Sequence, residues 1–314
     1  MHPEKRNSKI ELVVISHIVN ETIKFSNRTI EGVLGSPTAY SSVIASKLGI
    51  KTGMVTKIGK DMPKDLLQPI YEAGVDTRGI KVEGGNTTLS LLVYDEEGNK
   101  TILYPKKAPP ISSQDIPGDY LDAKMFYICP MDYEVSMETI KALSKVGAML
   151  AVDIGGYGGA HSYTHPSQGE RRTHAKLKEI VKFFQIVKAS SEDCGYFFEK
   201  KENKKKIATI FVEWGAKVGI VTLGEEGAIV ATKEKTLVNP VFPTNVVDCT
   251  GAGDAYMAGF LVEYLRTKGA WKSGLFASAT ASLVIEGTGG VVASRMPTRV
   301  QVLERLSKVD VKQL

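Results

Sequence analysis

The sequence predicts an α/β protein with a doubly wound, mainly parallel β-sheet, helices on both faces and a small β lid. Two observations predict the layered core: short apolar runs rich in β-branched residues recur along the chain, and segments with helical spacing separate them. A third observation, two segments with hairpin-like patterns, predicts the lid. The 314 residues are 43% hydrophobic and 24% charged. This composition is typical of a folded protein, and we expect one domain over residues 1–314.

The predicted sheet is built from apolar runs that are hydrophobic on both faces, as buried parallel strands are. These runs are 11–16, 52–58, 89–95, 124–129, 148–154, 184–190, 218–224 and 228–232. Helices are predicted over 37–49, 62–74 and 136–147, where apolar residues recur near every 3.6 positions and a glycine ends the pattern. Ser136 is a candidate N-cap for the third helix.

The lid is predicted from residues 17–33 and 80–105, which do not fit the strand and helix alternation. The second segment turns at 95–99, where Gly98 can take a positive φ. We expect the two hairpins to cover one edge of the core and to exclude water from a reaction there. Their exposed strand edges would suit a homodimer that pairs lid with lid.

Composition and charge argue against several functional classes. The net charge of +5 is small, and the lysine-rich stretch 199–206 lacks interleaved aromatics, so a solvated surface is expected and no nucleic-acid partner. Cys129, Cys194 and Cys249 lack disulfide or zinc spacing, which favours a reducing, cytoplasmic location. The apolar run at 11–16 is too short for a signal or membrane-spanning segment, so no membrane partner is expected.

Several common ligand motifs are absent. The nearest approach to a P-loop, at 53–61, has the wrong spacing and ends in Asp61. Tyr256 stands where the dinucleotide-binding fingerprint needs its third glycine. His161 and His165 lie four residues apart in a glycine-rich segment, where that spacing favours a surface loop over a zinc site.

The stretch VVDCTGAGDAYMAGF, residues 246–260, predicts an anion-binding site. Gly251, Ala252 and Gly253 immediately precede or begin an apolar helical pattern. Amides in a first helical turn lack intrahelical partners, and the helix dipole is positive there. The three residues are therefore expected to form an anion hole. From the motif alone, Asp254 suits a helix cap as well as it suits a functional carboxylate.

The same stretch resembles the second signature of the ribokinase-like (PfkB-type) carbohydrate kinases. Asp248 and residues 251–254 match that signature, and Cys249 stands where threonine is usual. Four other segments are similar to further elements of the family in the same order along the chain. They are the first signature at 34–49, the G-x-D element at 56–67, a nucleotide-side strand and turn at 221–230, and a closing loop at 285–291.

The resemblance implies a phosphotransferase that uses ATP and Mg²⁺ to phosphorylate an alcohol. Phosphoryl transfer needs a base for the hydroxyl proton and donors for the charge on the phosphoryl group. The resemblance assigns these roles to Asp254 and to the Gly251–Gly253 amides, and it implies that metal is held largely by phosphates and water. It also implies a role for Asp248 in binding a monovalent cation such as K⁺, with an Asx turn as an equal alternative.

Residues at the predicted strand ends are candidates for binding the nucleotide. The family's N-x-x-E element should fall near 187–195, where this chain has no asparagine and keeps Glu192 or Asp193 as the acid. Open α/β sheets bind ligands beyond the carboxyl ends of their strands. The expected nucleotide contacts are Lys188, Ser190, Glu192, Thr222, Gly224 and Gly227.

The acceptor side departs most from the family. Glu21 replaces a usual aspartate, Asn20 lies beside it, and Gly35 is followed by Ser36 where a second glycine is usual. Tyr40 or Ser41 replaces a later asparagine.

These departures favour a small polyol or sugar as the acceptor, myo-inositol in particular. A nucleoside kinase and a nucleotide-binding regulatory protein without turnover are the alternatives. Arg171 and Arg172 could bind an anionic group on the substrate, although a solvated pair at a helix start is the more common use of such residues.

Overall fold

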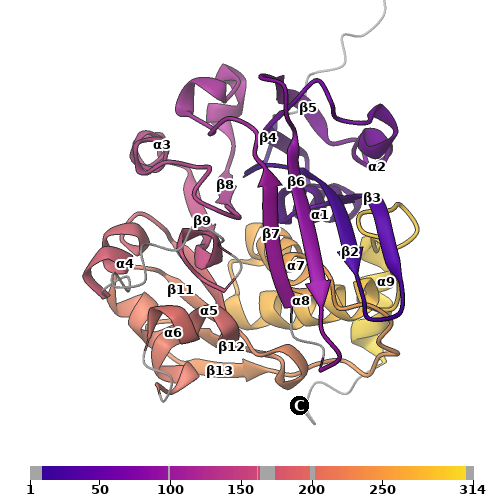
Figure 1. Ribbon diagram of the computed structural model, residues 1–314. Coiled ribbons are helices and arrows are strands. Elements are labelled where there is room, and N and C mark those ends of the chain that lie inside the picture. Colours follow the sequence, from indigo (N-terminus) through magenta and orange to yellow (C-terminus); the bar gives the residue numbers. More distant parts are fainter. Residues whose placement is uncertain (1–8, 98–99, 161, 163–173, 199–201, 309–314) are drawn as a thin grey trace, which may run out of the picture.

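The protein is built around one large sheet, shown in Figure 1. The computed structural model describes residues 9–97, 100–160, 162, 174–198 and 202–308. The nine strands of the large sheet lie in the order β13-β12-β11-β10-β9-β8-β1-β4-β5. In that order they are Thr236–Asn239, Ala228–Ala231, Val218–Thr222, Ile186–Ser190, Met149–Asp153, Met125–Ile128, Leu12–Ile15, Thr52–Ile58 and Asp76–Val82. The seven strands from β11 to β5 in this order are mutually parallel, which confirms the doubly wound α/β prediction.

Two expectations about this sheet were wrong. The run 228–232 was expected to be a parallel strand, but β12 is antiparallel to β11, and β13 is antiparallel to β12. Only the short turn η5 (Gly224–Glu226) joins β11 to β12, and such a connection can join only antiparallel neighbours. The run 89–95 was also expected among the core strands, and it lies in the second sheet instead.

The second sheet forms the lid and has the order β3-β2-β6-β7. Its strands are Thr29–Gly35, Val19–Lys24, Thr88–Tyr94 and Lys100–Lys106. Two antiparallel hairpins, β2–β3 and β6–β7, are joined through the parallel pair β2–β6. The predicted lid began at residue 80, but residues 80–82 end β5 in the large sheet. The second segment of the lid therefore starts at β6, and Gly98 at its turn is outside the described residues.

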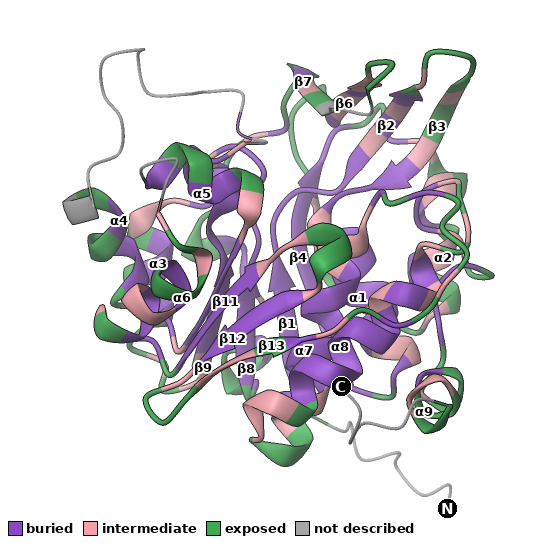
Figure 2. Ribbon diagram, turned by 90° about the horizontal axis from the view of Figure 1, so that it is seen from below, coloured by how far each residue is buried: buried purple, intermediate pink, exposed green. Residues whose placement is uncertain are grey.

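Helices cover both faces of the large sheet. On one face lie α1 (Pro37–Lys47), α2 (Gln68–Glu72), α7 (Ala252–Thr267), α8 (Ala270–Val284) and α9 (Arg299–Ser307). On the other lie α3 (Met137–Leu143), α4 (His174–Val181), α5 (Ser191–Phe197) and α6 (Lys204–Glu213). Short 3₁₀ turns complete the chain: η1 (Lys64–Leu67), η2 (Ser113–Asp115), η3 (Gly118–Asp122) and η4 (Ile154–Tyr157). Figure 2 shows the sheet buried between these helical layers.

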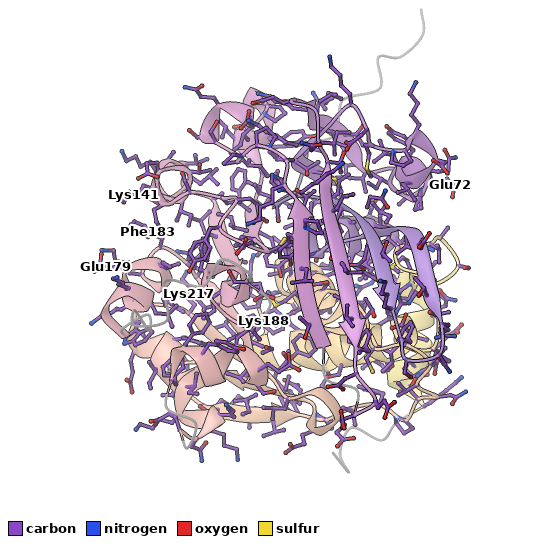
Figure 3. All side chains as sticks on the ribbon, viewed as in Figure 1. Glu72, Lys141, Glu179, Phe183, Lys188 and Lys217 are labelled. Carbon is purple, nitrogen blue, oxygen red and sulfur yellow. The ribbon has the colours of Figure 1, made fainter. Side chains whose placement is uncertain are left out.

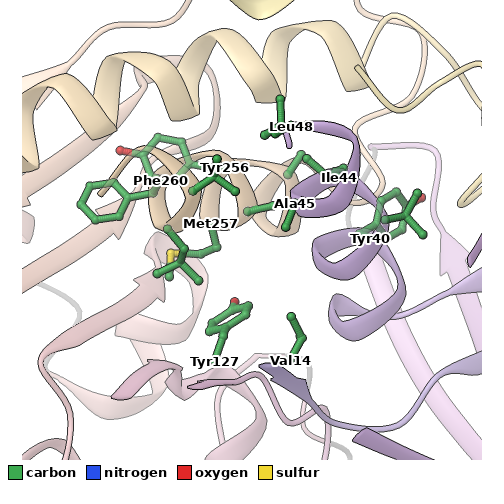
Figure 4. Packing of buried hydrophobic residues seen from close by; sticks show 14 of the residues in the cluster. Val14, Tyr40, Ile44, Ala45, Leu48, Tyr127, Tyr256, Met257 and Phe260 are labelled. Atoms are coloured by element: carbon green, nitrogen blue, oxygen red, sulfur yellow. The ribbon is translucent and has the colours of Figure 1, made fainter. Parts of the chain in front are cut away.

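Alternation along β1 explains the two cores. Leu12 and Val14 point into the core under α1 and α7, whereas Val13 and Ile15 point into the core under α3 to α6. Figure 4 shows the first of these cores, where Val14 and Tyr127 from the sheet lie below side chains of α1 and α7. Helices α1 and α7 thereby pack on each other and on the sheet, which sets where α7 begins.

The predicted helix starts are largely confirmed. Ser136 is the N-cap of α3, and its hydroxyl accepts the Thr139 amide at 3.2 Å. Ser36 caps α1 in the same way by accepting the Ala39 amide at 3.2 Å. The helix predicted over 62–74 is instead split into η1 and the short α2, with Pro69 at the start of the latter. Proline lacks the amide that a continuous helix would need at that position.

Candidate active site

A cavity of about 500 Å³ lies between the carboxyl ends of the central strands and the lid. Residues after β8, β9, β10 and β11 line it from the sheet, the start of α7 lines its floor, and β2, β6 and β7 line it from the lid. Strand order reverses between β1 and β8, since β4 and β5 continue to one side and β9 to β11 to the other. A cavity at such a switch point is where open α/β sheets bind ligands.

The start of α7 has the geometry that the glycine-rich stretch predicted. Gly251 is the N-cap residue with φ of 81°, in the left-handed region that favours glycine. A Cβ on Gly251 would lie 2.5 Å from ring carbons of Tyr40, so the turn also needs glycine for space. The amides of Gly251 and Gly253 belong to the helix start, where donors lack intrahelical acceptors. The Ala252 amide donates to the Cys249 carbonyl at 3.1 Å, so it is used within the turn, and the expectation that all three amides form the anion hole is corrected to the two glycines.

Asp254 lies in the first turn of α7 and lines the cavity. Gly251, and not Asp254, occupies the N-cap position, so the simple capping alternative does not explain the aspartate. The Asp254 carbonyl accepts the Ser41 hydroxyl at 3.4 Å, which ties α7 to α1 at this point. A carboxylate is thus fixed one residue beyond the expected anion hole.

A buried ion pair stands beside the helix start. Lys188 Nζ on β10 lies 2.6 Å from Asp153 Oδ2 on β9, and both residues line the cavity. A Cβ on Gly253 would be only 3.4 Å from that ammonium. Burial alone would lower the pKa of Lys188, but the Asp153 and Asp193 carboxylates reverse this and hold it above its ordinary value. Lys188, labelled in Figure 3, therefore keeps its positive charge in the interior.

Most of the expected nucleotide-side residues line the cavity. They are Lys188, Ser190, Glu192, Thr222 and Gly224. Gly227 is not among the described lining residues. Its φ of 89° favours glycine, and a Cβ there would lie 2.2 Å from the Asn239 carbonyl oxygen. The expectation for Gly227 is corrected to a packing role between β12 and β13.

The two acidic residues after β10, Glu192 and Asp193, have different surroundings. Asp193 forms a capping box with Ser190, accepting the Ser190 amide at 2.8 Å, and it also accepts the Ala160 amide at 3.0 Å. The Asp193 carboxylate therefore orders α5 and the loop after β9. Glu192, the preceding residue, is exposed and lines the cavity.

On the acceptor side, Glu21, Ser36 and Tyr40 line the cavity. Glu21 is 6% exposed and accepts the Ser90 hydroxyl at 2.9 Å, which joins β2 to β6. Neither Asn20 nor Gly35 is among the described lining residues. Asn20 points to the opposite face of β2 because strand side chains alternate. Gly35 supports the site indirectly: a Cβ there would lie 2.8 Å from Glu21 Oε2, so its lack of a side chain makes room for the carboxylate.

Ser36 adopts a backbone conformation that other residues rarely tolerate. Its φ is 102° and its ψ 154°, a region occupied almost only by glycine. The glycine that is usual at this position in the resembling family would adopt it without strain. In this chain a serine occupies the position, and its hydroxyl caps α1. The strain lies directly at the cavity wall.

The sequence analysis missed an apolar wall inside the cavity. Leu92, Ile102 and Tyr104 from the lid and Pro130 and Met131 after β8 make up this wall. Burial raises the pKa of Tyr104 well above its ordinary value, and nearby carboxylates, Glu21 and Asp254 included, add to this. In the structure, Ser90 and Leu92 share the inner face of β6, but the sequence of residues 88–94 has no polar and apolar alternation that would have marked them.

Asp248 makes the Asx turn that was one of its two alternatives. Its Oδ1 accepts the Thr250 amide at 2.8 Å, and its Oδ2 accepts the Thr288 hydroxyl at 2.9 Å. The lid reaches the same turn, where the Tyr94 and Thr250 hydroxyls are 3.1 Å apart. The described residues hold no group of three or more His, Cys, Asp or Glu placed to bind a metal.

Some of the sequence expectations fall outside the described residues. His161, His165, Arg171 and Arg172 are in this group, as are residues 199–201 of the lysine-rich stretch. Lys204 to Lys206 begin α6 at the surface, with Asn203 as its cap. Among the helices that are described, none is long and apolar enough to span a bilayer.

The cavity brings helix-start amides, a lysine and two carboxylates together. Helix-start amides and the Lys188 ammonium supply positive potential, Asp254 supplies a carboxylate, and Glu21 can hold hydroxyl groups opposite. This combination suits transfer of a phosphoryl group to an alcohol.

Comparison with known proteins agrees with this chemistry. Residues 9–299 match the model of the pfkB family carbohydrate kinases. The chain belongs to this family and is a phosphotransferase.

The relatives include kinases for both nucleosides and sugars. A cytidine kinase of Thermococcus kodakarensis is 31% identical over 260 residues, which cover 82% of this chain and 89% of the relative. The nucleoside kinase of Methanocaldococcus jannaschii, described as an archaeal member of the ribokinase family, has a TM-score of 0.72 at 22% identity and covers 96% of this chain and 99% of its own. A fructokinase double mutant from Vibrio cholerae, solved with fructose, ADP and a potassium ion, has a TM-score of 0.79 at 18% identity and covers 96% and 100%. These structures have the fold described above.

Proposed function

We propose that this protein transfers the γ-phosphoryl group of ATP to a hydroxyl group of a nucleoside. The observation that carries the proposal is the division of the acceptor side into a polar and an apolar part. Glu21 and Ser90 offer hydrogen-bonding groups to a sugar ring, whereas Leu92, Tyr104 and Met131 offer an apolar surface of the kind that a nucleobase covers.

The same division argues against myo-inositol, which the altered first signature favoured. Myo-inositol carries a hydroxyl on every ring carbon, so some of these would lie unpaired against the apolar wall, at a cost in free energy. The 31% identity to a cytidine kinase supports the nucleoside assignment. A sugar kinase remains the second candidate, because Glu21 alone suits any polyol.

In the proposed reaction, the acceptor hydroxyl gives its proton to the Asp254 carboxylate as its oxygen forms a bond to the γ-phosphorus. The bond between that phosphorus and the β–γ bridging oxygen breaks, and ADP leaves. The amides of Gly251 and Gly253 and the Lys188 ammonium stabilise the charge on the transferring group. Such residues would be without purpose in a regulatory protein that only binds nucleotide.

Mg²⁺ fits the nucleotide side with few protein ligands. Glu192 is an exposed acid at the cavity there, and the described residues offer no three-acid cluster, which suits a cation held mainly by phosphates and water. Bound Mg²⁺ would neutralise phosphate charge. Glu192 would hold its hydration shell in place.

The acceptor class can be tested by measuring ADP formation with cytidine, uridine, adenosine, ribose, fructose and myo-inositol. We expect kcat/KM for one of the nucleosides to exceed that for the free sugars by about 10²-fold, because covering the apolar wall with a base is worth about 2–3 kcal/mol. A preference for myo-inositol or fructose would contradict the nucleoside assignment. Stabilisation by ATP without turnover of any acceptor would favour the regulatory alternative.

Glu21→Gln should weaken use of the acceptor and leave use of ATP unchanged. Hydrogen bonds from hydroxyls to a carboxylate contribute about 1.5–3 kcal/mol, so kcat/KM for the acceptor should fall roughly 10- to 10²-fold. The matched control is Glu31→Gln, since Glu31 is an exposed carboxylate on lid strand β3. Steady-state kinetics with each substrate varied in turn makes the measurement. An equal rise in KM for ATP would place Glu21 on the wrong side of the cavity.

We also propose the homodimer through the lid and a location in a reducing compartment. On β6, the half-buried Leu89, Leu91 and Val93 alternate with cavity-facing Ser90 and Leu92, so this strand presents apolar side chains on the outer face of the lid. That surface supports the dimer. Cys129, Cys194 and Cys249, which are all among the described residues, form no disulfide with one another, which supports the reducing location.

A further inference from the structure

Arg295 is a buried arginine directly behind the anion hole, in the connection between α8 and α9. The Arg295 side chain is 1% exposed. Its Nε donates to the Val284 carbonyl at 2.9 Å. Nη1 donates to the Tyr40 hydroxyl at 2.7 Å and to the Gly290 carbonyl at 3.2 Å.

The second terminal nitrogen holds the turn before α7. Arg295 Nη2 donates to the Asp248 carbonyl at 2.9 Å and to the Thr250 carbonyl at 2.7 Å. The guanidinium thus has a partner for each of its five N–H donors. The Asp248 carboxylate lies 3.9 Å from Nη2 and balances the charge.

The oxygens around Arg295 form the kind of shell that a monovalent cation takes. Three backbone carbonyls, those of Asp248, Thr250 and Gly290, converge on the end of one guanidinium, with a carboxylate nearby. The family resemblance implies a monovalent cation at Asp248, and a related fructokinase was solved with potassium. In this protein the guanidinium fills the space between these oxygens, so K⁺ does not fit the residues present.

We infer that Arg295 is a built-in cation that orders the anion hole and makes catalysis independent of K⁺. The inference rests on the proposed role of the Gly251 turn in phosphoryl transfer. Arg295 is a positioning residue, because it acts through the turn and through Tyr40 and not on the substrate.

Arg295 is connected to the start of α7 through two sets of direct contacts. Arg295 fixes the carbonyls of residues 248 and 250, and Gly251 is the next residue along the chain. Arg295 also fixes the Tyr40 hydroxyl and lies 5.6 Å from the centre of the Tyr40 ring, against which Gly251 packs. Both contacts limit where the amides at the start of α7 can point. Because the guanidinium is part of the chain, this order needs no ion from solution.

The first part of the test uses the wild-type protein. Activity and thermal unfolding with Mg·ADP are measured in KCl, NaCl and choline chloride at equal ionic strength. We expect the same kcat and the same Tm in all three salts. A wild-type protein that loses activity without K⁺ would overturn the inference.

The second part uses Arg295→Ser, which opens a space still lined by the carbonyl oxygens. In choline chloride we expect kcat to fall about 10²-fold, as when an anion hole loses a donor, with little change in KM for ATP. KCl should restore much of the loss in a saturable way and should raise the Tm of the variant, because a cation that binds only the folded state stabilises it. A purely structural arginine would give a variant whose kcat and Tm ignore K⁺, and that result would overturn the inference.

Two controls complete the design. Arg299→Ser removes another partly buried arginine, paired with Glu263 at 2.9 Å, and should create no response to K⁺. Arg295→Lys keeps a positive charge and serves if the serine variant does not fold: its kcat should fall in every salt, because an ammonium cannot bond all the carbonyls at once. Full activity of Arg295→Lys would contradict the inference. The Tm measurements need no acceptor, so they stand even if the nucleoside assignment fails.

Discussion

Asp254→Asn is expected to lower kcat by about 10³-fold while leaving nucleotide binding intact, because general bases contribute roughly 10² to 10⁴ to such reactions. Asparagine has nearly the same shape but cannot take the hydroxyl proton. Asp254 lies in the first turn of α7 and lines the cavity, and the helix is capped by Gly251 and not by this side chain. The substitution should therefore leave the fold in place.

The measurement is single-turnover and steady-state kinetics, with Kd for ADP and Tm determined on the same samples. Asp65→Asn is the matched control, since Asp65 is an exposed carboxylate in the first turn of η1. Asp65→Asn should behave as wild type. Full turnover by Asp254→Asn would contradict the proposed mechanism. Loss of ADP binding would mean that Asp254 acts on the nucleotide.

Gly251→Ala should reduce both the activity and the stability of the protein. The φ of 81° costs an alanine about 1–2 kcal/mol, and its Cβ would lie 2.5 Å from the Tyr40 ring. Tyr40 cannot yield, because it is 1% exposed and its hydroxyl is held by Arg295. The turn must move instead. We expect kcat to fall about 10²-fold or more because the amides no longer point at the phosphoryl group. Overpacking should also lower the free energy of unfolding by about 1–3 kcal/mol.

Kinetics and denaturant unfolding of Gly251→Ala separate the two effects. Gly269→Ala is the control at the start of α8: its φ is −93°, and its Cβ would meet nothing closer than Thr267 Oγ1 at 3.6 Å. Gly269→Ala should match wild type in both assays. If Gly251→Ala loses stability but keeps its kcat, the turn is needed for packing alone and the anion hole lies elsewhere.

The core and the catalytic floor could be predicted because their signals are local. Apolar runs with both faces hydrophobic mark strands such as β8 to β11, and the glycines of 251–253 mark the left-handed N-cap at α7. The reversal of β12 was open to inference as well, since η5 is too short for a parallel crossover. The boundary of the lid was harder to place, because β5 has no pattern that separates it from a lid strand.

Which side chains face the cavity could be determined only from the strands and helices that pack around them. Asn20 and Glu21 are neighbours in sequence, yet strand alternation brings one to the cavity and turns the other away. Gly35 and Gly227 matter for what they make room for, Glu21 and the Asn239 carbonyl, and those partners come from other strands.

The chain sequence thus specified the reaction: a carboxylate next to glycine amides at a helix start, within a run of family elements in order. The tertiary structure specified the apolar wall, which draws on β6, β7 and the segment after β8, and the position of Arg295. That arginine stands 45 positions from Thr250 and 255 from Tyr40, and only folding brings its guanidinium to both. The catalytic motif could be recognised because its residues are neighbours along the chain. The apolar wall and the arginine behind the turn come from distant segments, which meet only when the helices pack on the sheet.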